Sequence, residues 1–178
     1  MKNVKQQTDK TEKIFKKKKE TNILNENDFE KAQQYICFML GEEEFGINIV
    51  NIREVIPMSK YTRVNNLPEF AKGVINLRGE IIALLDIKLF FKITDYSYKH
   101  TRRTKIIITR DSGRDAGFIV DYVTAARMIS ENNIQPTPKN VEGISAEYIS
   151  GVVHTGDRPI ILLNVNKILF SEAFAEFQ

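Results

Sequence analysis

Apolar residues occur along the chain in short runs separated by polar breaks, and the run over residues 70–90 is the most regular of them. It contains two segments rich in Val, Ile and Leu, one on either side of Arg78-Gly79-Glu80. Glycine adopts positive φ freely, so this break predicts a tight turn between two strands. Asp86 follows the second strand and is expected to cap a short helix that reaches Phe91.

The same pattern returns over residues 148–165 without a gap. The aligned pairs include Gly73 with Gly151, Leu84 with Leu162, Leu85 with Leu163, and Asp86 with Asn164. Such a match indicates an internal duplication. Arg78 has Gly156 as its counterpart, so an arginine is not needed to form this hairpin. We therefore expect the role of Arg78 to be specific to the first copy.

Further strands are predicted on both sides of this hairpin. Apolar, alternating segments cover residues 34–40, 44–50, 105–109 and 116–123, with turns at 41–43 and 111–115. Residues 46–50 and 117–121 begin with Gly-Ile and Gly-Phe at matching places before the two hairpins, so the repeat extends over each half. Residues 49–56 fit a helical turn and a strand equally well, and residues 131–141 are expected to form a loop.

Two short helices complete the prediction. Residues 67–73 carry Pro near the start and Gly at the end, which is typical of a short helix. Asn164 is expected to open a C-terminal helix whose apolar positions are Val165, Ile168, Leu169 and Phe170. Short strands with turns about every 8–12 residues, in two similar halves, favour a mainly β fold of two small barrels side by side, over about 34–95 and 104–170.

The positive charge of the chain is confined to its start. The 178 residues have a formal net charge of +3, but 17 basic and 17 acidic residues remain once residues 1–34 are set aside. Residues 1–33 contain few apolar residues and the block Lys16 to Lys19, so we expect a disordered basic tail. Such a block can bind nucleic acid or an anionic membrane, but it is more often a solvated tail.

Composition places the protein in the cytoplasm and gives no reason to expect direct membrane insertion. The longest apolar runs are the length of a strand, and the lysine-rich start lacks the apolar core of a signal peptide. Cys37 is the single cysteine, so an internal disulfide is impossible, and its apolar setting favours a packed thiol.

Candidate chemistry is scarce along the whole chain. The two histidines, His100 and His154, have no neighbouring Cys, His or paired carboxylates at the spacing of metal ligands. Phosphate-binding loops, dinucleotide fingerprints and nucleophile elbows are missing from the sequence, and the Asp residues of the turns are explained by turn formation. We therefore predict no catalytic residues, no metal site and no cofactor.

Two charged residues stand out because they lie among apolar neighbours. The apolar neighbours of Glu54 are Ile52, Val55 and Ile56, and those of Arg78 are Ile75, Leu77, Ile81 and Ile82. A charge in such a setting is usually paired, because removing an unpaired charge from water costs on the order of several kcal/mol. A Glu54–Arg78 salt bridge is the economical hypothesis. The alternative is that each charge faces solvent at the end of its strand.

Several segments, taken together, resemble the CheW family of bacterial chemotaxis coupling proteins. They are Leu-Gly-Glu-Glu-Glu-Phe-Gly-Ile at 40–47, Ile-Arg-Glu-Val at 52–55, Lys-Gly-Val-Ile-Asn-Leu-Arg-Gly at 72–79, Leu-Asp-Ile at 85–87, Tyr-Ile-Ser-Gly at 148–151 and Gly-Asp-Arg at 156–158. The match runs from about residue 34 to 170. It implies a CheW-like domain over residues 34–172, built from two SH3-like five-stranded β-barrels with short helices and a C-terminal helix.

The resemblance also implies a function without catalysis. CheW-like proteins bridge the regulatory domain of the histidine kinase CheA to the cytoplasmic tips of methyl-accepting chemoreceptors in signalling arrays. By motif position, the receptor-binding groove of the family corresponds to Ile49, Ile52, Glu54, Gly73 and Arg78, and Ile106 is expected to line it too. The family pairs this glutamate with this arginine, which supports the Glu54–Arg78 hypothesis.

Other interpretations are less favoured by the residues. The basic tail is additional to the family pattern, and Asn164 stands where Asp is common, although Asn also caps helices well. The regulatory domain of CheA and the N-terminal domain of CheV share the expected fold, but the 178 residues include no kinase or receiver domain, which favours a free coupling protein. Nucleic-acid binding is disfavoured because the chain after the tail is neutral and has no aromatic platform among Lys and Arg.

Overall fold

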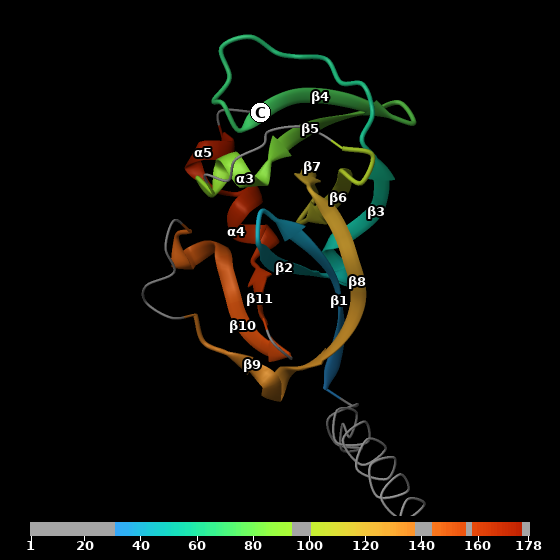
Figure 1. Cartoon of the computed structure of the whole chain (residues 1–178). Coiled ribbons are helices and arrows are strands. Elements are labelled where there is room, and N and C mark those ends of the chain that lie inside the picture. The colour runs from blue at the N-terminus through green and yellow to red at the C-terminus, as the bar shows by residue number, and fades with distance from the viewer. Residues whose placement is uncertain (1–30, 94–100, 138–143, 156–157, 176–178) are drawn as a thin grey trace, which may run out of the picture.

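The computed structural model describes residues 31–93, 101–137, 144–155 and 158–175, and in these ranges the chain forms two β-sheets with a few short helices (Figure 1). The larger sheet has six strands: β1 (Ala32–Leu40), β2 (Glu43–Asn48), β8 (Tyr122–Ser130), β9 (Ile134–Gln135), β10 (Ile149–Thr155) and β11 (Arg158–Leu163). The smaller has five: β3 (Ile52–Pro57), β4 (Ala71–Leu77), β5 (Glu80–Asp86), β6 (Lys105–Asp111) and β7 (Arg114–Val120). The predicted mainly β fold is confirmed.

The two sheets do not correspond to the two halves of the sequence. The strand orders are β8-β1-β2-β11-β10-β9 and β3-β6-β7-β5-β4, so each sheet takes strands from both halves. The expected assignment of one barrel to residues 34–95 and another to 104–170 is therefore wrong for the sheets. Four pairings between the halves cause this exchange: β2 with β11 and β5 with β7, which are parallel, and β1 with β8 and β3 with β6, which are antiparallel.

The internal duplication is visible in how these parallel strands meet. Gly46 of β2 lies opposite Leu162, and Gly117 of β7 lies opposite Leu84, which are equivalent pairs in the two copies. A Cβ on Gly46 would lie 2.9 Å from Leu162 Cδ2, and one on Gly117 would lie 2.5 Å from Leu84 Cδ2. The glycine of each copy thus leaves room for the leucine side chain of the other half. This favours pairing of strands between the halves over pairing within one half.

Short helices connect and cover the sheets: η1 (Ile49–Asn51), α3 (Ile87–Phe90), η2 (Glu131–Asn133), η3 (Ala146–Tyr148), α4 (Val165–Leu169) and α5 (Glu172–Ala175). The predicted caps are present in both copies. Asp86 Oδ1 accepts a hydrogen bond from Leu89 N at 3.2 Å, and Asn164 Oδ1 accepts one from Lys167 N at 3.1 Å. None of the helices in the described ranges is both long and apolar enough to cross a membrane.

Three local predictions need correction or completion. Residues 67–73 do not form a helix: Ala71 N donates to Pro68 O at 2.9 Å in a single turn, and β4 starts at once because Gly73 is needed inside that strand. Residues 49–56 contain both candidate structures, η1 followed by β3. The described part of the expected loop at 131–141 contains η2 and β9.

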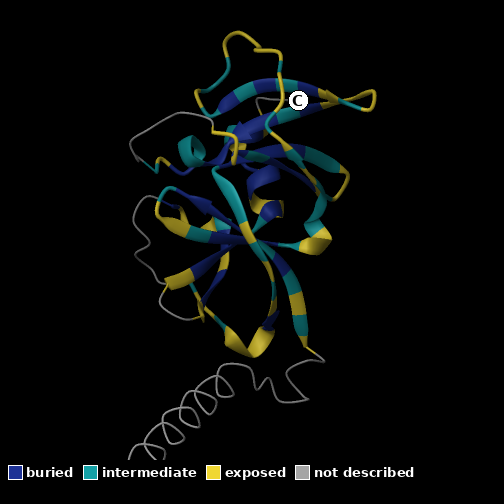
Figure 2. Cartoon of the chain, turned by 45° about the vertical axis from the view of Figure 1, so that its right-hand side comes forward, coloured by how far each residue is buried: buried dark blue, intermediate teal, exposed yellow. Residues whose placement is uncertain are grey.

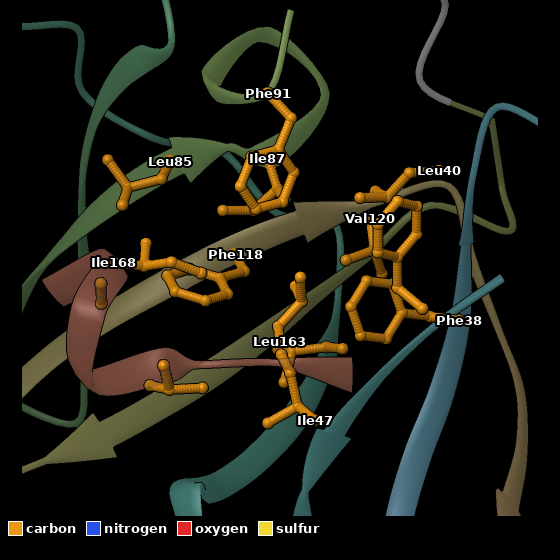
Figure 3. Packing of buried hydrophobic residues seen from close by; sticks show 14 of the residues in the cluster. Phe38, Leu40, Ile47, Leu85, Ile87, Phe91, Phe118, Val120, Leu163 and Ile168 are labelled. Atoms are coloured by element: carbon orange, nitrogen blue, oxygen red, sulfur yellow. The ribbon is translucent and has the colours of Figure 1, made fainter. Parts of the chain in front are cut away.

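The main hydrophobic core lies where the two sheets meet and is covered by α3 and α4. Side chains from both sheets and from both helices converge there (Figure 3), and the buried positions gather in the same region, while exposed ones collect at turns (Figure 2). Val165, Ile168 and Leu169 are buried as expected, whereas Phe170 is 43% exposed. Two smaller hydrophobic clusters are also present, one formed by residues of the six-stranded sheet and one by residues of the five-stranded sheet. The predicted disordered tail lies outside the described residues up to residue 30, and Ala32 already belongs to β1.

Candidate functional site

The turn between β4 and β5 presents Arg78 at the tip of a tight hairpin. Leu77 and Glu80 are paired across the strands, so the turn consists of Arg78 and Gly79, with φ of 54° and 94°. Positive φ at both positions is the geometry whose twist suits a two-residue hairpin. Asn76 Oδ1 accepts a hydrogen bond from Gly79 N at 2.8 Å and fixes the turn. The hairpin predicted from the sequence is confirmed.

Strand β3 brings Glu54 to the opposite edge of the same sheet. Its pairing with β6 shifts between Ile52 and Glu54, so Arg53 is the extra residue of a β-bulge. A bulge changes where neighbouring side chains point, and here it aims Arg53 and Glu54 at the end of the sheet where the Arg78 turn lies. Both β3 and β4 are edge strands of the five-stranded sheet.

Glu54 and Arg78 are in contact. Arg78 Nη2 donates to Glu54 Oε2 at 3.0 Å, with side-chain exposures of 78% for Arg78 and 24% for Glu54. The pair joins the β3 edge of the sheet to the hairpin that carries the β4 edge. An ion pair this open to solvent contributes little to stability, about 0–1 kcal/mol. Its position at the surface leaves the guanidinium available to other acceptors.

A second set of charges surrounds this pair, and with it forms what we call the edge cluster: Arg53, Glu54, Arg78, Glu80, Arg110 and Asp115. Arg53 Nη1 donates to Glu80 Oε2 at 2.6 Å and also to Asp115. Arg110 holds Asp115 through two hydrogen bonds, of 2.6 and 2.7 Å. These hydrogen bonds from Arg110, with a smaller contribution from Arg53, hold the pKa of Asp115 below its ordinary value against the opposing effect of burial.

The short helix η1, which precedes β3, carries the expected Ile49. Ile49 is 39% exposed and its neighbour Val50 is 80% exposed, so two aliphatic side chains face solvent here. Asp111 anchors this helix, because its carboxylate accepts from Asn51 Nδ2 at 2.8 Å and from Asn166 Nδ2 at 2.9 Å. Ile52 is half-buried and packs against the main core. The site thus offers exposed apolar groups on an anchored short helix, followed along the chain by charges.

Gly73 and Ile106 lie inside the fold. A Cβ on Gly73 would be 2.0 Å from Thr62 O, so the glycine permits a backbone segment to pass over β4. Ile106 is completely buried and packs with Ile75, Leu84 and Ile119 in the cluster inside the five-stranded sheet. The expectation that Ile106 lines a binding groove is therefore wrong: with no exposed surface, it shapes the sheet beneath the site.

The sequence alone did not single out three residues of the edge cluster: Arg53, Glu80 and Asp115. Asp115 looked like an ordinary turn residue, and nothing local marked Arg53 or Glu80. A signal was present in the copies, because Glu80 aligns with Arg158 of the second hairpin, a reversal of charge at one position of the repeat. Finding the contacts themselves required the bulge and the exchanged strand order.

Groups able to do covalent chemistry do not converge in the described ranges. No set of three or more His, Cys, Asp or Glu side chains suited to a metal ion occurs there. Cys37 is fully buried, and burial is the main cause that raises the pKa of its thiol to about 11. His154 is exposed on β10, and His100 lies outside the described residues. The exposed apolar groups and the paired charges of the site are suited to binding another molecule.

Comparison with known proteins identifies the family. Residues 34–173 match the model of the CheW-like domain. The chain belongs to the CheW-like family. Its relatives include the chemotaxis protein CheW of Klebsiella aerogenes, 34% identical over 144 residues that cover 81% of this chain and 86% of the relative. The chemotaxis protein CheW of Helicobacter pylori is 32% identical and is covered over 93% of its length by 88% of this chain.

A solved CheW structure has the same fold. The crystal structure of the scaffolding protein TtCheW from Thermoanaerobacter tengcongensis superimposes with a TM-score of 0.73 at 33% sequence identity. The match covers 80% of this chain and 90% of that one. The resemblance to CheW inferred from the sequence motifs is therefore confirmed by sequence and by structure.

Proposed function

We propose that this CheW-like protein is a non-catalytic chemotaxis scaffold that couples methyl-accepting chemoreceptors to a CheA-type histidine kinase. The names of its relatives support a role in chemotaxis, and the name of the solved relative supports a scaffolding role. In this proposal the protein works in the cytoplasm, associated with membrane chemoreceptor arrays. It uses no cofactor, binds no nucleic acid and does not insert into the membrane.

The observation that carries the proposal is the exposed Glu54–Arg78 pair beside the short helix η1 with its exposed apolar side chains. A chemoreceptor tip is helical, and an amphipathic helix can place its apolar side on Ile49 and the partly exposed Ile52. Its polar side would then meet the guanidinium of Arg78, which is 78% exposed and already oriented by Glu54. Gly73 contributes indirectly, by letting residues 62 and 63 pack closely over β4, the strand that leads to Arg78.

The pair also supports the finer description of the fold. We propose that each sheet curls into an SH3-like barrel, the one of β3 to β7 brought to closure where Glu54 meets Arg78 across its edge strands. The regulatory domain of CheA, which shares this fold in the family, is the proposed kinase partner. In this description each barrel contains strands from both halves of the chain.

Individually weak contacts suffice for this role. Receptors and kinases in an array present many copies of each contact, which raises the effective concentration at every site. Because one scaffold touches both partners, a change in receptor conformation that alters its binding also shifts the kinase equilibrium.

The test is a binding titration of the full chain with the cytoplasmic signalling fragment of a chemoreceptor from the same organism. Arg78→Ala is expected to weaken binding at least about fivefold, equal to the roughly 1 kcal/mol or more of a partly desolvated charged contact. Arg158→Ala, which removes an exposed arginine from the corresponding second hairpin, is the matched control and should bind as the wild type does. Equal behaviour of the two variants would contradict the proposed site.

A further inference from the structure

The edge cluster contains charges that the Glu54–Arg78 pair does not itself need. We propose that Arg53 and Glu80, anchored by Asp115, are positioning residues that hold the Arg78 turn in register with Glu54 for receptor binding. This inference rests on the function proposed above and extends it to residues that do not themselves touch the receptor.

The contacts form a chain from the interior of the sheet to the turn. Asp115, whose side chain is 16% exposed, is held on β7 by both hydrogen bonds of Arg110. Arg53 contacts this anchored carboxylate and extends to Glu80 Oε2 at 2.6 Å. Glu80 is the first residue of β5, directly after the turn. The tip of the hairpin is thereby tied to the most fixed charge of the cluster.

Two ion pairs, Arg53–Glu80 and Glu54–Arg78, fix the orientation of the turn, whereas a single pair would not. Arg53 and Glu54 are consecutive on β3, and their partners Glu80 and Arg78 stand on either side of Gly79. A single ion pair with an exposed arginine leaves the hairpin tip free to rotate about that contact. The second link, of opposite polarity, restricts this rotation, so the Arg78 guanidinium keeps one direction before a partner arrives. Preorganisation of this kind lowers the entropy cost of binding.

The other copy of the duplication shows which contacts the fold itself needs. The pair Ile108–Gly117 in one sheet is equivalent to the pair Cys37–Gly46 in the other. Counting from these pairs, Glu54 corresponds to Ala125, Arg53 to Thr124 and Asp115 to Glu44. The bulge is retained, and Thr124 Oγ1 donates to Glu44 Oε1 at 2.5 Å. In this copy Thr124 supplies the contact between bulge and carboxylate, and Arg127 Nη2 also lies 3.4 Å from Glu44 Oε1. Thr124 is too short to go on from that carboxylate to a residue of the turn, as Arg53 does.

This comparison supplies the variant that separates positioning from folding. Arg53→Thr introduces the residue that the other copy uses and loses the link to Glu80. Asp115 keeps both hydrogen bonds from Arg110, so the melting temperature should be retained. Glu80→Gln, at a side chain that is 54% exposed, removes the same link from its other end. The first variant removes a positive charge and the second a negative one, so a general electrostatic effect on binding would have opposite signs.

The experiment titrates the full-length variants with the chemoreceptor signalling fragment and records a thermal melt for each. We expect Arg53→Thr and Glu80→Gln each to weaken binding about fivefold, the upper range of a surface ion pair. In the Arg78→Ala background, each should change binding less than about twofold, because positioning residues act through Arg78. Glu44→Gln in the other sheet is the matched control and should bind as the wild type does.

Each other outcome identifies what has failed. If Arg78→Ala weakens binding but Arg53→Thr and Glu80→Gln bind normally, the positioning role is refuted and the proposed receptor site stands. If both weaken binding equally in the presence and absence of Arg78, they act independently of it and the inference is also wrong. If Arg78→Ala itself binds normally, the proposed site falls and the positioning role with it.

Discussion

Gly73→Ala is the substitution whose effect can be worked out most directly from the structure. Gly73 has φ of 136°, and the three atoms nearest to an added Cβ are all backbone: Thr62 O at 2.0 Å, Arg63 Cα at 2.9 Å and Thr62 C at 2.9 Å. Backbone atoms cannot rotate away as the end of a side chain can. The segment around Thr62 must therefore move off β4.

The expected cost has two parts. An L side chain at such a φ costs about 1–2 kcal/mol. Moving Thr62 also breaks its two hydrogen bonds with Val74, each of 2.8 Å, which adds roughly 1 kcal/mol apiece. Gly73→Ala should therefore lower the free energy of unfolding by about 3–4 kcal/mol. Gly79→Ala is the matched control, because φ there is 94° but nothing lies within 4 Å of its Cβ. It should cost only the first part, about 1–2 kcal/mol.

Urea unfolding of the two variants, followed by far-ultraviolet circular dichroism, measures the difference. Gly73→Ala should unfold at a clearly lower urea concentration than Gly79→Ala, with a similar dependence on denaturant. Equal loss of stability in the two variants would refute the reasoning, since it would mean that backbone conformation alone accounts for the cost and that the close approach of Thr62 does not. Gly151 occupies the same place in the second copy but does not have a positive φ, and an added Cβ would first meet the side-chain methyl Ile134 Cγ2 and then Gln135 O at 2.9 Å. Gly151→Ala should therefore cost less than Gly73→Ala.

Three further predictions concern the site and the core. Arg78→Gly should change the free energy of unfolding by less than about 1 kcal/mol, because glycine tolerates the positive φ and this offsets the loss of the ion pair with Glu54. The same variant should weaken receptor binding in a titration. Ser112→Gly, at a φ of 47° in the β6–β7 turn, is the control and should leave binding unchanged. The pKa of Asp115 is lowered in the folded state, so its carboxylate stabilises the fold above about pH 4 and this contribution is lost as the pH falls further. Asp115→Asn should therefore lose less stability than the wild type in urea titrations between about pH 6 and pH 3; a steeper loss would contradict the sign. Cys37, fully buried and with its pKa raised to about 11, should react with a thiol reagent only as fast as the protein unfolds, and rapid labelling of the native protein would contradict that burial.

Local chemistry made much of the fold predictable. The Arg78-Gly79 turn, the caps at Asp86 and Asn164 and most strands follow from residue types within a few positions of each other. The contact between Glu54 and Arg78 was also expected, because two charges among apolar neighbours need partners. The helix expected at 67–73 was wrong because its Pro and Gly serve a turn and a close backbone approach.

The exchange of hairpins between sheets could not be predicted in the same way. A repeat in the sequence shows that two halves are alike, but it does not say whether each half closes on itself or pairs with the other. That choice is made by contacts such as Gly46 with Leu162, which are far apart in the chain. The edge cluster depends on the same choice, because Arg53 reaches Asp115 only when β3 and β7 share a sheet. The burial of Ile106 likewise depends on this sheet, where it packs with Ile75, Leu84 and Ile119.

Co-sedimentation tests whether this protein links a chemoreceptor to a kinase, as proposed above. Receptor-bearing membranes are mixed with the cognate CheA-type kinase and pelleted with wild-type protein, with Arg78→Ala, or with neither. The kinase should enter the pellet with the wild-type protein, much less of it should do so with Arg78→Ala, and little should pellet without the protein. If the kinase pellets equally in all three mixtures, or in none, the proposed coupling role is contradicted.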